Sequence, residues 1–332
     1  MDNIKTAVIG VGALGRHHLR WYTQLEGSEV IGIYDIDRAK AEQYAREYNI
    51  TAFESLEETA AAVDAVSIAV PTTSHFEVAS EIIERGVHCL IEKPITANTI
   101  EAEKLKRLAE QSGVTVTVGQ IERFNPAVQA LKDMAVTPSF IEAHRLAAFN
   151  PRGTDVAVVL DLMIHDIDLV LMLVKSTVVD LQASAVAVVS EEEDIANARL
   201  TFDNGAVANL TASRISLHAM RKLRIFQPFG YYSLDLAAKQ ADIYRLVEPG
   251  EDGDGMRMPL GQSGRELLYS KRPDSGQDML GAELEAFLKA VRGKQPVAVS
   301  LGEAVEALRI AREVERIGAE AAERLKGSHA IS

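Results

Sequence analysis

The sequence predicts an α/β protein: an N-terminal doubly wound parallel sheet, then a C-terminal α+β domain with a large, mostly antiparallel sheet. Two observations support this prediction. In the first third of the 332-residue chain, short β-branched strands alternate with helices, which is typical of parallel sheets covered on both faces. After about residue 119, several strands follow one another across short turns, which favours antiparallel pairing. We expect the domains to span 1–122 and 123–332.

The N-terminal region contains five predicted strands with helices between them. Asp37, Ser55 and Asn98 stand where each side chain can accept a hydrogen bond from the first turn of a helix. Gly86 and Gly113 stand where helices are expected to end. The expected strands are 6–9, 30–34, 65–69, 88–91 and 114–118, and the expected helices are about 13–25, 38–48, 55–61, 76–85 and 100–111.

The C-terminal region begins with a strand and a long helix, followed by further strands. Asp203-Asn204-Gly205 predicts a tight hairpin turn between two of them. The stretch 249–278 is rich in glycine, proline and charge, so we expect it to be irregular. Of the two closing helices, we expect the second to return to the first domain. The expected strands are 140–148, 178–189, 196–202, 206–213, 223–227 and 231–235, and the expected helices are 156–174, 280–292 and 301–325.

Composition narrows the functional classes. A hydrophobic content of 47% and a charged content of 25% are those of an ordinary globular protein. The net charge of −13 argues against non-specific nucleic-acid binding and against attachment to anionic membranes. Cys89 is the only cysteine, and the first strand begins too early to leave room for a signal peptide. We therefore expect a cytoplasmic protein with neither nucleic acid nor membrane as a partner.

A glycine-rich turn follows the first predicted strand. Gly10 lets the chain turn sharply, Gly12 lacks a Cβ that would hold a phosphate away, and Gly15 allows the next helix to approach the sheet. That helix directs its free N–H groups and positive dipole end toward the turn. The motif therefore predicts a dinucleotide site, and a tight βα turn of another doubly wound protein is the alternative. The expected contacts in the turn are Gly10, Gly12, Ala13, Leu14 and Gly15.

An acidic residue ends the second predicted strand. Asp35 stands about 20 residues past the last glycine, where a carboxylate accepts hydrogen bonds from the adenosine ribose. The same carboxylate would repel a 2′-phosphate, which favours NAD. Arg38, three residues later, could soften this preference, so NADP remains the less favoured alternative.

The tripeptide Glu92-Lys93-Pro94 follows the fourth predicted strand. It should lie at the carboxyl edge of the sheet, where ligands bind in open α/β folds. Lys93 would place a cation beside the nicotinamide and its substrate, and the proline after it is a candidate for a cis peptide. Glu92 could pair with Lys93 or cap a helix. An ordinary charged loop is the alternative.

The long predicted helix carries a second polar group of side chains. Asp161, His165 and Asp168 are spaced to share one helix face, whereas Asp166 points elsewhere and is expected to be structural. A carboxylate one turn from an imidazole can hold its tautomer and stabilise its charged form. The alternatives are a metal site, which a single histidine makes unfavourable, and a buried polar cluster.

These groups meet the requirements for oxidising an alcohol. Histidine titrates near neutral pH, so His165 is suited to take the hydroxyl proton. Lys93 is suited to stabilise the developing alkoxide, while a nicotinamide takes the hydride. The predicted catalytic residues are Lys93, Asp161 and His165, without a metal.

The chain resembles the glucose–fructose oxidoreductase/inositol dehydrogenase family, Gfo/Idh/MocA, over nearly its whole length. The resemblance rests on the glycine motif, on Asp35, and on V-P-T-T-S-H at 70–75, E-K-P at 92–94 and D-L-M-I-H at 161–165. It implies an N-terminal Rossmann domain, and a C-terminal sheet commonly used for homodimer or homotetramer contacts. Cofactor or active-site contacts carried over from the family are Pro71, Thr72, His75, Glu92, Lys93, Gln120 and Asn125.

Two further stretches, 119–126 and 158–169, resemble a subgroup that oxidises the sugar 3-hydroxyl of UDP-N-acetylglucosamine. A diphosphate would need a local basic pocket in this acidic chain. Basic residues of the second domain could supply it or could solvate strand edges instead: Arg145, Arg152, Arg214, His218, Arg221, Lys222 and Arg224. The expected substrate contacts are Lys93, Arg123, Arg152, Asp161, His165 and Arg221.

Two other functions remain open. One is a dehydrogenase of a free sugar or cyclitol, with the same cofactor. The other is a protein that senses the redox state of NAD without turnover, which would leave Lys93, Asp161 and His165 without a purpose.

Overall fold

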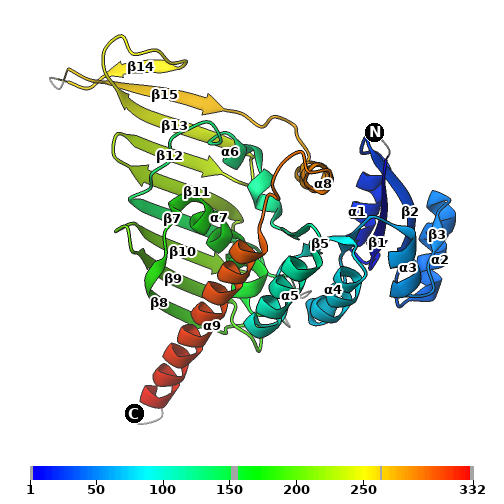
Figure 1. Ribbon diagram of the computed structural model, residues 1–332. Helices are drawn as coiled ribbons and strands as arrows, with labels where there is room; N and C mark the ends of the chain where they lie inside the picture. Colours follow the sequence, from blue (N-terminus) through cyan, green and yellow to red (C-terminus); the bar gives the residue numbers. More distant parts are fainter. Residues whose placement is uncertain (1–2, 151–155, 262–263, 330–332) are drawn as a thin grey trace. The chain divides into compact units, whose positions relative to one another are not determined.

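The computed structural model describes residues 3–150, 156–261 and 264–329 (Figure 1). The chain forms two compact units. Unit 1 contains the chain up to Phe124 together with Asp278–Leu308. Unit 2 contains Asn125–Gln277 and the chain from Arg309 onward.

Unit 1 is built on a six-stranded sheet in which all neighbouring strands are parallel. The strand order is β3-β2-β1-β4-β5-β6, so the direction of winding reverses beside β1. In doubly wound sheets, ligands bind at the carboxyl ends of the strands at this reversal. The predicted sheet is confirmed, with β3 added because two residues are too few to predict. The strands are β1 Ile4–Ile9, β2 Ser28–Tyr34, β3 Thr51–Ala52, β4 Ala65–Ile68, β5 His88–Glu92 and β6 Val116–Gly119.

The helices of unit 1 begin where the sequence predicts caps. The side chains of Asp37, Ser55 and Asn98 each accept a hydrogen bond from a backbone N–H of the first helical turn. Gly113 ends α5 in the left-handed conformation, with φ +67°. The helices are α1 Gly15–Tyr22, α2 Arg38–Tyr48, α3 Leu56–Ala62, α4 His75–Glu84, α5 Thr99–Ser112 and α8 Met279–Val291.

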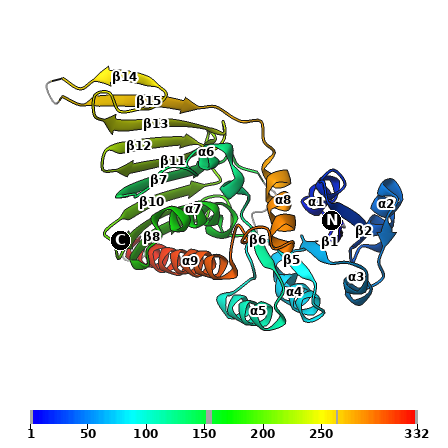
Figure 2. The same ribbon diagram turned by 45° about the horizontal axis from the view of Figure 1, so that its top comes forward.

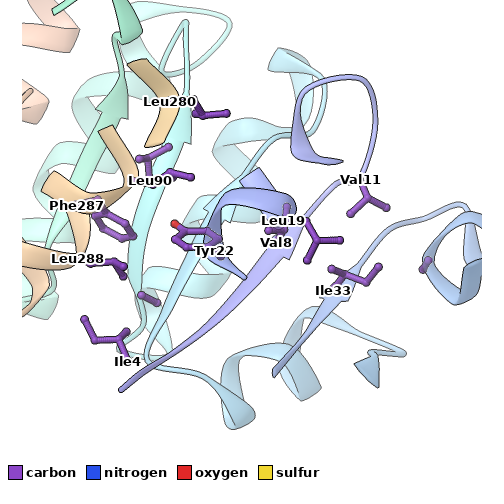
Figure 3. Close-up of a cluster of buried hydrophobic side chains, with 13 residues drawn as sticks. Ile4, Val8, Val11, Leu19, Tyr22, Ile33, Leu90, Leu280, Phe287 and Leu288 are labelled. Atoms are coloured by element: carbon purple, nitrogen blue, oxygen red, sulfur yellow. The ribbon is translucent and has the colours of Figure 1, made fainter. Parts of the chain in front are cut away.

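Helix α8 comes from the far end of the chain and completes the core of unit 1. Leu280, Phe287 and Leu288 pack with Leu19 and Tyr22 of α1 in one buried cluster (Figure 3). Each fully buried side chain of this size contributes about 1.5–3 kcal/mol through the hydrophobic effect. Unit 1 therefore depends on a segment far from it in sequence.

Unit 2 contains a nine-stranded sheet with the order β14-β15-β13-β12-β11-β7-β10-β9-β8. Only β7 and β10 pair in parallel, so the predicted antiparallel character is confirmed. The strands are β7 Phe140–Leu146, β8 Val178–Val186, β9 Ile195–Phe202, β10 Val207–Ser213, β11 Met220–Gln227, β12 Gly230–Asp235, β13 Gln240–Val247, β14 Met256–Pro259 and β15 Glu266–Arg272.

Helices cover one face of this sheet, as Figures 1 and 2 show. Helix α6 (Pro126–Gln129) and helix α7 (Ile164–Val174) contact its central strands. The part of α9 (Leu301–His329) beyond Leu308 lies against β8. The approach is close at Gly318, where an added Cβ would lie only 2.8 Å from the Ala185 side chain. The opposite face carries no helix of unit 2 in the part of the chain that the structure describes.

Two predictions about unit 2 are wrong. The stretch expected to be irregular contains the edge strand β14 and its neighbour β15. Both are largely polar and carry little of the apolar alternation that marks a strand in the sequence. The expected α-helix from 156 to 174 is shorter: the segment opens with a π-helical turn at Val159–Met163, and the α-helix begins at Ile164. No helix within the described ranges is long and apolar enough to cross a membrane.

Candidate active site

The glycine-rich turn at the carboxyl end of β1 has the geometry of a phosphate cradle. Gly10 has φ +85°, and a Cβ there would lie 2.8 Å from the carbonyl oxygen of Ala69. A Cβ on Gly15 would lie only 1.8 Å from the carbonyl oxygen of Gly10. A Cβ on Gly12, by contrast, would meet nothing within 4 Å. The chain therefore needs two glycines for its own packing, and the third leaves open space for a ligand.

Asp35 is part of the same cradle. Its Oδ2 accepts a hydrogen bond from the backbone N–H of Val11 at 2.8 Å, and its Oδ1 accepts one from Asp37 at 2.8 Å. A carboxylate has about four acceptor positions, so capacity remains for ribose hydroxyls. Asp35 therefore fixes the turn as well as presenting a carboxylate beside it.

Arg38 is engaged within the protein. Its guanidinium donates to the carbonyl oxygens of Ala52 and Phe53, at 3.1 and 2.9 Å, and pairs with the carboxylates of Glu42 and Glu54. A guanidinium held this way by β3 is poorly placed to bind a 2′-phosphate. The expectation that Arg38 contacts the cofactor gains no support from this geometry.

Lys93 follows β5 directly and is half-buried, and the Lys93–Pro94 peptide is cis, as the sequence suggested. The ring of His75 lies beside this segment. Its Nδ1 is 2.9 Å from the carbonyl oxygen of Pro94, and its Nε2 is 3.0 Å from that of Val70. Burial lowers the pKa of His75, although both carbonyl groups oppose the shift. With both ring nitrogens against protein carbonyls, His75 is placed to position the chain rather than to contact a ligand.

The side chain of Glu92 turns into the interior of unit 1. Its Oε1 lies 2.9 Å from Nε2 of His18, and neither side chain is more than 11% exposed. His18 is a residue that the sequence analysis missed. Helical spacing could have shown that His18 is buried, because the buried face of α1 consists of residues at helical intervals: Gly15, His18, Leu19 and Tyr22.

Gln120 follows β6 and is 2% exposed. Its side-chain Oε1 is buried and has no hydrogen-bond partner among the residues that the structure describes. A buried amide oxygen without a partner is costly, so a ligand donor at this strand end would stabilise it. Together with the open space at Gly12, this observation shows that the residues present fit a dinucleotide such as NAD.

Other expected contacts are divided between surface and interior. Pro71 and Leu14 are exposed, and Thr72 is half-buried at the start of a short 3-10 turn. Arg123 is buried and donates to Ala298 and Glu303, both at 2.8 Å.

Asn125 caps α6, accepting from Ala127 and donating to Leu236 at 2.9 Å. The expected ligand contacts of Arg123 and Asn125 therefore gain no support here.

Asp161 and His165 lie in unit 2. Asp161 belongs to the π-helical turn and His165 to the first turn of α7, and both are half-buried. Asp168, expected to share their face, is only 1% exposed. Asp166 forms a buried ion pair with Arg145 at 2.8 Å, which agrees with its expected structural role.

The basic residues of unit 2 that the structure describes are divided between the interior and the two faces of the sheet. Arg145 and Arg214 are buried, with Arg214 donating to the carbonyl oxygen of Val156. Lys222 pairs with Asp235 at 3.7 Å, and Arg224 pairs with Glu142 at 3.2 Å. Arg152 lies outside the described residues.

Strand alternation separates the remaining basic residues. Leu223 and Ile225 are buried under the helices, so Arg221 lies on that face, and Lys222 and Arg224 lie on the other. Arg221 and His218 are exposed. Of the predicted basic residues that the structure describes, these two are the ones best placed to meet a ligand.

A metal centre finds no support in the residues that the structure describes. Among 3–150, 156–261 and 264–329, no group of three or more His, Cys, Asp or Glu side chains is arranged to hold a metal ion.

Comparison with known proteins identifies the family. Residues 4–120 match the oxidoreductase family with an NAD-binding Rossmann fold, and residues 141–228 match the GFO/IDH/MocA C-terminal domain. The chain is 40% identical to a UDP-N-acetylglucosamine 3-dehydrogenase of Acidithiobacillus ferrooxidans, over 90% of this chain and 91% of the relative.

A solved structure of a UDP-N-acetylglucosamine 3-dehydrogenase from the same organism matches with a TM-score of 0.87 and 37% identity, covering 97% of this chain and 99% of the other. A myo-inositol dehydrogenase of Streptomyces leeuwenhoekii is 28% identical, over 93% of this chain and 96% of that protein. The chain belongs to the GFO/IDH/MocA family of NAD-binding oxidoreductases.

Proposed function

We propose that the protein is a cytoplasmic, NAD-dependent nucleotide-sugar dehydrogenase that oxidises the 3-hydroxyl of UDP-N-acetylglucosamine. The observation that supports dehydrogenase chemistry most strongly is the cradle formed by Gly12 and Asp35 at the winding reversal of the parallel sheet. The substrate is inferred from the relative that is 40% identical over nearly the whole chain.

The proposed catalytic residues are Lys93 of unit 1, and Asp161 and His165 of unit 2. Bound NAD supplies the acceptor for the hydride that leaves the sugar carbon. His165 takes the hydroxyl proton, and Asp161 stabilises the imidazolium that results. Lys93 stabilises the negative charge that develops on the same oxygen.

The preference for NAD over NADP is proposed from charge. Asp35 presents a carboxylate beside the cradle, and Arg38, the nearby cation, is already engaged by two carbonyl groups and two carboxylates. A 2′-phosphate would therefore meet negative charge without a compensating partner.

Binding of the UDP group is proposed to involve Arg221, with His218 as its neighbour on the exposed segment that leads into β11. Arginine suits a diphosphate because its guanidinium donates two parallel hydrogen bonds. Arg152 is kept as a further proposed contact, although it lies outside the described residues.

We also propose that the open face of the nine-stranded sheet forms the contact between subunits of a homodimer or homotetramer. Aromatic side chains on this face form a continuous row across neighbouring strands, with ring centroids 4.8–5.7 Å apart. Such a row suits an interface core. It consists of Phe140, Phe226, Tyr231, Tyr244 and Tyr269. Analytical ultracentrifugation should show an oligomer for the wild type and a smaller species for Tyr244→Lys.

The test of function is a substrate panel. NADH absorbance is followed with UDP-N-acetylglucosamine, UDP-glucose, N-acetylglucosamine, glucose and myo-inositol, each with NAD and with NADP. The proposal predicts the highest kcat/KM for UDP-N-acetylglucosamine with NAD. Preference for myo-inositol or free glucose would establish the free-sugar alternative, and NADH binding without turnover of any compound would establish the redox sensor.

A further inference from the structure

Two buried imidazoles flank the segment Glu92-Lys93-Pro94. His18 contacts its first residue through the Glu92 carboxylate, and His75 contacts its last through the carbonyl oxygen of Pro94. His18 is 0% exposed and His75 is 1% exposed. Neither ring is accessible to a substrate, so any effect of these residues on Lys93 must pass through the segment itself.

The Glu92 carboxylate is confined to one position. It is buried, and removing a carboxylate from water costs several kcal/mol unless a partner compensates. Nε2 of His18 lies 2.9 Å from Oε1 of Glu92, within the distance of an ion pair, so the imidazole is the polar group beside this carboxylate. On another side, a Cβ on Gly119 would come within 3.0 Å of Oε1, so the end of β6 leaves little room. Helix α1 and strand β6 thus fix the residue that immediately precedes Lys93.

His75 fixes the residue that follows. Its ring spans the 2.9 Å to the carbonyl oxygen of Pro94 and the 3.0 Å to that of Val70, which lies just beyond β4. The backbone on the far side of Lys93 is thereby tied to the neighbouring strand of the sheet. Lys93 itself remains half-buried.

We propose that His18 and His75 are positioning residues for Lys93, with His18 acting through Glu92 and His75 through the backbone of Pro94. The catalytic consequence rests on the proposed role of Lys93, whereas the positional claim does not. A displacement of about 1 Å in a reacting group can lower the rate about 100-fold, so loss of either contact should reduce kcat rather than cofactor affinity.

The experiment measures the reactivity of the Lys93 amine directly, without turnover. The full-length protein is treated with trace amounts of a reductive methylation reagent, and labelling of Lys93 is quantified by mass spectrometry relative to exposed Lys104. His18→Leu and His75→Leu should each change Lys93 labelling by about threefold or more, because a displaced amine meets different charges and a different exposure to water. His17→Leu is the matched control, because His17 neighbours His18 but lies outside the buried face of α1.

Kinetics and rescue complete the test. His18→Leu should lower kcat about 10- to 100-fold while the dissociation constant of NADH stays within about twofold. His18→Gln, which keeps a polar side chain that can donate to Glu92, should recover Lys93 labelling and most of kcat. If His18→Leu does not fold, Glu92→Gln, which keeps the volume and removes the charge, must show the same labelling change.

Wild-type Lys93 labelling in folded His18→Leu, or in Glu92→Gln, would overturn the proposal. Full turnover by Lys93→Met would instead contradict the proposed function and leave the labelling result to decide the positional claim.

Discussion

The carboxylate of Asp35 and the backbone N–H of Val11 are joined by a 2.8 Å hydrogen bond that connects the end of β2 to the glycine-rich turn. A second bond, from the N–H of Asp37, occupies the other carboxylate oxygen. Asp35 therefore has two roles that a single substitution would affect together: it shapes the turn, and it places negative charge where the adenosine ribose of a dinucleotide would lie.

Replacing Asp35 by serine should change cofactor preference. Removing the negative charge relieves repulsion worth on the order of 1 kcal/mol or more, so the ratio of kcat/KM for NADP to that for NAD should rise at least about fivefold. Affinity for NADH should also fall, because Val11 and Asp37 lose a charged acceptor. Asp37→Ser is the control, since serine still caps α2. An unchanged ratio in Asp35→Ser would show that another residue selects the cofactor.

His165→Asn should lower kcat about 100- to 10,000-fold, because the hydroxyl proton loses its acceptor. Asp161→Asn should act in the same direction but less strongly, since it removes stabilisation of the imidazolium and leaves the base in place. NADH titration by fluorescence should give wild-type affinity in both variants. Loss of NADH binding together with kcat would indicate that these residues maintain the fold instead.

Arg221→Ala should raise KM for UDP-N-acetylglucosamine about 10- to 100-fold, because a charge-assisted bidentate contact contributes about 1.5–3 kcal/mol. The matched control is Arg224→Ala, on the opposite face of the same strand and paired with Glu142. Only Arg221→Ala should raise the KM for the nucleotide sugar. Equal effects of both variants would point to damage to the sheet and would remove Arg221 from the proposed site.

Asp194 gives unit 2 a measurable dependence on pH. Burial raises the pKa of its carboxyl group, but hydrogen bonds from the backbone N–H groups of Ser190, Val189 and Val188 outweigh burial and hold the pKa well below its usual range. Because the folded pKa is lowered, the stabilisation is present above the unfolded pKa and is lost as the pH falls through the folded value.

Asp194→Asn should therefore reduce the free energy of unfolding by about 2 kcal/mol at neutral pH. The difference from wild type should shrink below about pH 4. Urea unfolding at several pH values measures it, with the exposed Asp252→Asn as control. A difference that stays constant down to low pH would rule out the charged carboxylate as its source.

The parallel sheet of unit 1 could be predicted because local patterns determine it. Alternating β-branched strands and helices, caps such as Ser55, and the glycines at 10–15 each specify structure within a few residues. The edge strand β14 and its neighbour β15 could not be predicted, because their stability comes from pairing with neighbouring strands and not from apolar alternation. The π-helical turn at Val159–Met163 was equally inaccessible, since a segment buried on most sides carries no clear periodicity.

The candidate site shows the same division. Gly12 and Asp35 could be placed from spacing alone, because their partners lie within one βαβ unit. The pairing of His18 with Glu92 joins residues 74 positions apart, so it required the fold. The surroundings of the basic residues in unit 2 also required the fold, because register with other strands decides that Arg224 meets Glu142 and that Lys222 meets Asp235.

The most direct test of the proposed chemistry uses UDP-N-acetylglucosamine carrying deuterium on C3 of the sugar. The enzyme is incubated with NAD, and the isotope content of the NADH formed is measured by mass spectrometry, with Lys93→Met and His165→Asn alongside. The account predicts deuterium in the reduced nicotinamide, slower formation than with unlabelled substrate if hydride transfer limits the rate, and little product in either variant. NADH without deuterium, or no NADH from this substrate while another sugar is oxidised, would contradict it.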